Sequence, residues 1–234
     1  MLMDIFSSFD SYEFNSLSIM KNTVLLSTMI YLFTSLITSF WVENNRLNSI
    51  LTYPVNLMYN QLNRTQSIKI KGYTVIVSTL FIMIVFLNLT GMIPYSFSIS
   101  THLILTLSMG LPMWLVIISS SMFKHKKKFI ANMLPDGAPD WLNPFLVLIE
   151  TISIMVRPLT LSFRLAANMS AGHIVLSLLG IYSSVAINSF LLSSITLLLM
   201  SMAYILFEFA ICLIQAYIFC LLLSLYTDDH TTTY

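Results

Sequence analysis

Long apolar runs separated by short polar stretches dominate the pattern of the chain. Three runs have about the 20 apolar residues that a helix needs to cross a bilayer core, and they predict spanning helices at 23–42, 73–93 and 103–122. The apolar region from about residue 141 to residue 226 is longer than two ordinary spans and is interrupted near 180–188. It predicts two long helices, 145–178 and 188–226, joined as an antiparallel hairpin.

Both helices of the predicted hairpin exceed about 25 residues, so they must be strongly tilted or kinked to fit a bilayer. Pro158 lies inside the first of them and predicts a kink, because proline removes a backbone donor from the helix.

The segment 43–71 mixes apolar residues with Asn, Gln and Arg and does not have the composition of a span. This pattern is typical of an amphipathic helix that lies on the membrane surface. With 1–22 as an outer N-terminal segment and no internal repeat, residues 1–234 are predicted to form a single membrane domain.

The composition narrows the class of protein. Hydrophobic residues make up 57% of the 234 positions and charged residues only 9%, whereas a soluble domain averages about 25% charged. The chain is therefore predicted to be an all-α polytopic membrane protein with about five membrane helices and one surface helix. The net charge of +1 does not suggest nucleic-acid binding. Cys212 and Cys220 lie about 80° apart on a helix and are interpreted as packing residues rather than a disulfide or metal site.

The basic residues orient the predicted helices. Four basic residues lie in 43–71 and four in 123–140, whereas 94–102 has none and 1–22 is acidic. The positive-inside rule then places the N-terminus outside and the two basic loops inside. The predicted hairpin then starts and ends on the inside. The acidic N-terminus does not resemble a targeting segment, which suggests synthesis inside the organelle or cell that uses the protein.

Five ionisable residues fall within the predicted hairpin. Placing a charged side chain at the centre of a bilayer costs about 3 kcal/mol or more. The five residues are Glu150, Arg157, Arg164, His173 and Glu208. The first three follow a seven-residue spacing and share a helix face, which Asn168 joins one turn beyond Arg164. Such residues commonly pair with one another or mark an ion pathway.

Antiparallel neighbours keep a nearly constant sum of residue numbers. Three polar pairs have sums close to 380: His173 with Glu208, Arg164 with Gln215, and Glu150 with Asp229. They would lie at the outer, middle and inner levels of the membrane. The alternative interpretation is that water or backbone groups satisfy each of these residues separately.

The three levels suggest a proton path. His173 and Glu208 can relay protons on the outer side, and Glu150 with Asp228 or Asp229 on the inner side. Arg164 keeps its proton and would block transfer between the two zones. A mobile carboxylate is then needed at the midplane, and the chain has none there, so the carrier is predicted to belong to a partner.

Four sequence segments carry a family resemblance. They are RPLTLSFRLAANMSAGH (157–173), LNLTGMIPYSF (87–97), FEFAICLIQAYIF (207–219) and IETISIMVRP (149–158). They resemble the a subunits of F-type ATP synthases, in the mitochondrially encoded form. The likeness covers most of the chain and is most specific at 145–226.

The resemblance implies a rotary proton mechanism. It implies that Arg164 faces a ring of small hairpin c subunits, that Gln215 and Arg157 play a supporting part with Gln215 contacting Arg164, and that Asn168, one turn beyond Arg164, belongs to the outer side of the path. It assigns His173 and Glu208 to the outer half-channel and Glu150 to the inner exit, with Asp228 or Asp229 beside it. It also implies a b-subunit stalk and small accessory subunits as partners, the mitochondrial inner membrane as location, and nucleotide chemistry on other subunits. No metal or cofactor is expected.

Several alternatives stay open from the residues themselves. A self-contained secondary transporter or ion channel would need its own midplane site, usually with inverted repeats. A purely structural membrane subunit would not need five ionisable groups in its hairpin. Arg157 could reach lipid headgroups rather than serve the path.

Overall fold

The structure of the chain is a computed structural model, and it describes residues 46–93, 98–124, 126–131, 140–187 and 191–231. The described segments fold into helices only: α2 (Arg46–Leu62), η3 (Gln66–Lys69), α3 (Tyr73–Gly91), η4 (Ile99–Thr101), α4 (Leu103–Lys124), α5 (Lys126–Ala131), η5 (Asp140–Leu142), α6 (Asn143–Ile187) and α7 (Leu191–Thr231). The predicted all-α class is confirmed. The predicted segment 1–22 and span 23–42 lie outside the described residues.

Four of the described helices are long and apolar enough to cross a membrane: α3, α4, α6 and α7. The bounds of α3 and α4 agree with the predicted spans 73–93 and 103–122 to within two residues at either end. The predicted amphipathic segment 43–71 contains α2 and η3. Gly72 then makes the turn into α3 with a φ of 79°, in the left-handed region that glycine adopts without strain.

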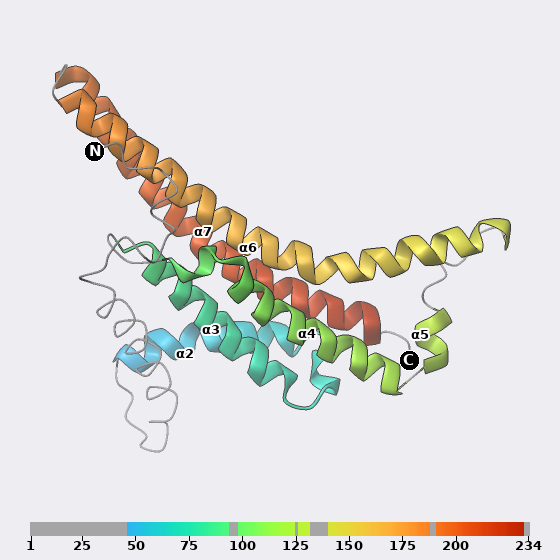
Figure 1. The fold of residues 1–234 in the computed structure, drawn as a ribbon. Helices are drawn as coiled ribbons and strands as arrows, with labels where there is room; N and C mark the ends of the chain where they lie inside the picture. The colour runs from blue at the N-terminus through green and yellow to red at the C-terminus, as the bar shows by residue number, and fades with distance from the viewer. Residues whose placement is uncertain (1–45, 94–97, 125, 132–139, 188–190, 232–234) are drawn as a thin grey trace.

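The predicted hairpin is present, with longer helices than expected. At 45 residues, α6 is about 68 Å long, more than twice the thickness of a bilayer core. It is bent rather than straight, as Figure 1 shows, and Pro158 lies inside it, in agreement with the predicted kink.

The predicted break at 180–188 is wrong for most of its length, because α6 continues through Gly180 to Ile187. One glycine costs a helix only about 1 kcal/mol relative to alanine, and no proline follows that would end the helix. The helix therefore extends to the end of the described segment.

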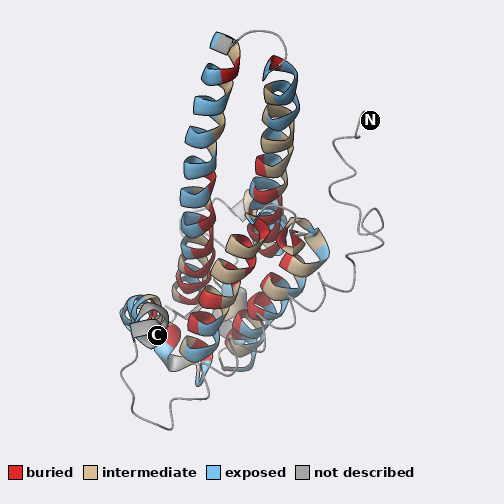
Figure 2. Cartoon of the chain, turned by 90° about the vertical axis from the view of Figure 1, so that its left-hand side faces the viewer, coloured by how far each residue is buried: buried red, intermediate tan, exposed pale blue. Residues whose placement is uncertain are grey.

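A buried core ties the inner half of the hairpin to the other helices. Its residues come from all five long helices: Met58, Leu62, Tyr73, Val77, Ile84, Met113, Ile117, Leu161, Leu165, Ala216, Phe219, Cys220 and Leu223. The outer half of the hairpin projects beyond this bundle, and most of its residues are exposed or half-buried (Figure 2). Large apolar side chains such as Val185, Met200 and Leu206 are exposed there, which indicates contact with lipid or with another membrane protein.

Candidate functional site

Contacts between α6 and α7 follow nearly the predicted register. A Cβ added to Gly172 would overlap the Glu208 carboxylate, and the Cys212 thiol lies 3.3 Å from the Met169 sulfur. The side-chain amide of Asn168 donates to Gln215 Oε1 at 2.8 Å. Each of these pairs has residue numbers that add up to about 380. The hairpin therefore aligns its polar residues by depth.

At the outer level, Glu208 is buried, with 3% of its surface exposed. Neither of its carboxylate oxygens has a hydrogen-bond partner within the described part of the chain. The same holds for Nε2 of His173, the residue that follows Gly172 on the facing helix. Buried polar atoms without hydrogen-bond partners destabilise a fold. Three such atoms nevertheless lie at this one depth. These are groups that can accept and release protons.

Gly172 is the residue that makes room for Glu208, because any side chain at this position would meet the carboxylate. We expect Gly172→Ala to displace Glu208 and to cost about 1–3 kcal/mol through overpacking. If Glu208 lies on the proton path that the sequence predicts, proton pumping by the assembled protein in vesicles falls as a result. Gly180→Ala is the matched control, since nothing lies within 4 Å of a Cβ at that position on the same helix. Equal pumping by both variants would contradict this assignment.

At the middle level, the observed pairing differs from the prediction. Gln215 is buried and accepts a hydrogen bond from Asn168, one helical turn beyond Arg164. No hydrogen bond joins Arg164 to Gln215 among the described side chains, so the predicted Arg164–Gln215 pair is not observed. The reason is the orientation of α6: Arg164 lies on the exposed face of the hairpin, whereas Gln215 faces α6.

Arg164 is exposed, and it forms no ion pair with any carboxylate in the described part of the chain. On the same side of the helix, the small residues Thr160, Ala167 and Ala171 are exposed, together with Asn168. Small residues allow another helix to approach the backbone closely in a membrane. This face therefore presents a cation among small residues.

At the inner level, Arg157 joins the two helices. Its guanidinium lies 3.8 Å from Glu150 Oε1 and 3.4 Å from Asp229 Oδ2. It also lies 5.4 Å from the centre of the Tyr226 ring. Asp228 is turned away from this group, because its Oδ1 accepts a hydrogen bond of 2.6 Å from the backbone N–H of Gln66. The geometry thus brings Asp229, and not Asp228, to the guanidinium that Glu150 also contacts.

One buried polar residue near the outer level was not predicted from the sequence. Asn88 on α3 is fully buried, its amide donates to the carbonyl oxygen of Cys212 at 3.3 Å, and its Oδ1 has no partner in the described structure. Cys212 is one helical turn from Glu208, so Asn88 lies close to the outer level. An asparagine inside an otherwise apolar span was the available signal. The described residues contain no group of three or more His, Cys, Asp or Glu placed to hold a metal ion.

Comparison with known proteins gives consistent matches. The family model described as ATP synthase A chain matches residues 17–228. ATP synthase subunit a of Albinaria caerulea is 40% identical over 235 residues, which cover 98% of this chain and all of that relative. ATP synthase subunit a of Mytilus edulis is 35% identical over 99% of this chain and all of its own length. ATP synthase F(0) complex subunit a of Mus musculus is 40% identical over 80% of this chain and 83% of its own.

Proposed function

Since the chain belongs to the ATP synthase A chain family, we propose that it is the stator subunit that conducts protons in the membrane sector. Protons pass through two offset half-channels, one opening on each side of the membrane. The subunit carries out no nucleotide chemistry and needs no cofactor, because the transported species is the proton itself.

One observation carries the proposal: an exposed arginine lies between two separate groups of proton-exchanging side chains. His173 is nine residues beyond Arg164 and Glu150 is fourteen residues before it, which corresponds to about 14 Å and about 21 Å along a helix. Direct proton transfer requires hydrogen-bond distance, so neither group can pass a proton to the other unaided. A mobile carrier must complete the path.

The carrier is a carboxylate on the ring of c subunits, which packs against the exposed face around Arg164. A proton from the outer side reaches the ring carboxylate by way of His173 and Glu208. The neutral carboxylate then turns through lipid until it meets Arg164 from the other side. There it releases the proton toward Glu150 and Asp229. Each charge moved is worth about 2.3 kcal/mol per 100 mV, and this energy drives rotation.

The surroundings follow from the same proposal. The protein is a multi-pass subunit of the mitochondrial inner membrane, with its N-terminus toward the intermembrane space. Its partners are the c ring, the b subunit of the peripheral stalk, small accessory subunits and membrane lipid. No nucleic acid is involved.

The test of the proposal is whether conduction depends on the ring. We expect vesicles that carry the membrane sector without its catalytic head to conduct protons, and vesicles in which only the c ring is missing to conduct none. The measurement is the decay of an imposed pH gradient, with the amount of this chain in each vesicle preparation determined separately. Conduction without the ring would make the chain a self-contained channel or transporter instead.

A further inference from the structure

The inner cluster consists of Glu150, Arg157, Tyr226 and Asp229, and Arg157 contacts side chains from both of its helices. The guanidinium lies within 4 Å of two carboxylates, Glu150 on α6 and Asp229 on α7. The Arg157 side chain is 26% exposed, less than that of Glu150 at 39% or Asp229 at 60%. A side chain that reached out to lipid headgroups would have its charged end more exposed than its partners.

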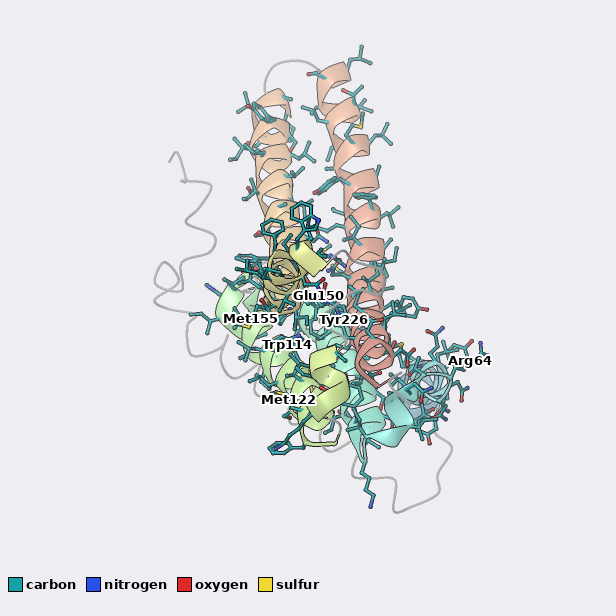
Figure 3. All side chains as sticks on the ribbon, turned by 90° about the vertical axis from the view of Figure 1, so that its right-hand side faces the viewer. Arg64, Trp114, Met122, Glu150, Met155 and Tyr226 are labelled. Atoms are coloured by element: carbon teal, nitrogen blue, oxygen red, sulfur yellow. The ribbon has the colours of Figure 1, made fainter. Side chains whose placement is uncertain are left out.

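The Tyr226 ring adds a third contact to the guanidinium. Its centre lies 5.4 Å from the guanidinium carbon, within the range of a cation–π contact. Figure 3 shows Glu150 and Tyr226 together where the inner parts of α6 and α7 face each other, with Arg64 on the other side of α7. The cation is therefore held in one position between the two helices.

The two neighbouring aspartates of α7 contact different elements of the fold. Asp228 accepts the backbone N–H of Gln66 in η3, and Asp229 turns to Arg157 on α6. The end of α7 is thus fixed between two elements, and this arrangement determines which aspartate stands beside Glu150. Arg157 provides the contact that holds Asp229 toward α6.

We propose that Arg157 is a positioning residue that holds Glu150 and Asp229 together as one two-carboxylate proton acceptor at the inner exit. This inference rests on the proposed function of the chain. Arginine does not release its proton, so Arg157 does not carry protons itself. Its planar fork of five donors can serve two acceptors at once, which a lysine does less well. Without this cation, the two like charges repel and separate.

The experiment compares variants of the assembled complex in inner-membrane vesicles. The variants are Arg157→Gln, Arg157→Lys, Asp229→Asn, Glu150→Gln and the double variant Arg157→Gln/Asp229→Asn. Arg64→Gln is the matched control, because Arg64 is exposed on the far side of α7 and lies outside the cluster. Two quantities are measured: the amount of assembled complex, and ATP-driven proton pumping per assembled complex.

We expect Arg157→Gln to lower pumping per complex by about two- to fivefold, about the factor by which the loss of an exposed ion pair shifts an equilibrium. Arg157→Lys should recover part of the loss. The double variant should pump no less than Asp229→Asn alone, because the two residues act through the same contact. Arg64→Gln should pump like the unaltered complex.

Three results would overturn the inference. If Arg157→Gln lowers only the amount of assembled complex, the residue merely ties the helices together. If its effect multiplies with that of Asp229→Asn, it acts independently of that carboxylate. If Asp229→Asn and Glu150→Gln both pump normally, the inner path itself is wrong. Only that last result also contradicts the proposed function, so the two failures can be told apart.

Discussion

Arg164→Ala is expected to abolish ATP-driven proton pumping while passive proton leak through the membrane sector stays the same or rises. Arg164 is exposed on α6, with small residues around it and no carboxylate partner in the described part of the chain. Its charge is therefore available to an approaching carboxylate from another subunit. In the proposed mechanism, removing the charge removes both the group that displaces the proton from the carrier and the barrier between the two half-channels.

The measurement is ATP-driven acidification of vesicles, together with the rate at which an imposed pH gradient decays when ATP is absent. Arg64→Ala is the control, since it removes an exposed arginine from the inner side of the same chain. Because Arg164 is exposed, its replacement leaves no unpaired buried group, and the complex should assemble normally. Unchanged pumping by Arg164→Ala would reduce this arginine to a surface charge and refute the stator mechanism.

Glu208→Gln is expected to produce the second largest effect, a loss of at least about tenfold in pumping per assembled complex. Glu208 is 3% exposed, and its two oxygens have no partner among the described residues. The amide has nearly the same shape but cannot take up and release a proton. Packing against Gly172 is therefore preserved, and only the proton-exchanging group is lost.

The control for this variant is Thr196→Val, which alters an exposed polar residue of α7 outside the polar levels of the hairpin. His173→Gln should reproduce part of the Glu208→Gln loss, since His173 Nε2 at the same level is also buried without a hydrogen-bond partner among the described residues. Pumping is measured per assembled complex, so that poor assembly cannot be mistaken for a blocked path. Normal turnover in Glu208→Gln would mean that protons enter by another route.

The pattern of apolar and polar residues was sufficient to predict the class of fold and the presence of the hairpin. Apolar runs of about 20 residues predict spans because the bilayer thickness sets the length of a helix that crosses it. The seven-residue spacing and the constant sum of residue numbers predict the depth of each polar residue, because both depend only on helix geometry. The contact of Glu208 with Gly172 agrees with the predicted level of the His173–Glu208 pair.

The end of α6 and the partner of each polar residue could not be predicted in this way. Gly180 suggested a break, but local propensity is weak compared with the hydrogen bonds of a continuous helix. Gln215 was paired with Arg164 on residue numbers, which cannot tell a residue that faces the neighbouring helix from one that faces outward. The rotation of α6 about its axis decides this, and it places Asn168 where its amide donates a hydrogen bond to Gln215.

The sequence by itself determined that the chain is an all-helical membrane protein with polar residues at three depths of one hairpin, because helix period and membrane thickness act locally along the chain. Only the tertiary structure decided that Arg164 faces outward, that Asp229 rather than Asp228 shares Arg157 with Glu150, and that Asn88 contacts α7 one turn from Glu208. These outcomes depend on packing between helices far apart in the chain. Such packing selects one of several orientations that the sequence pattern allows equally.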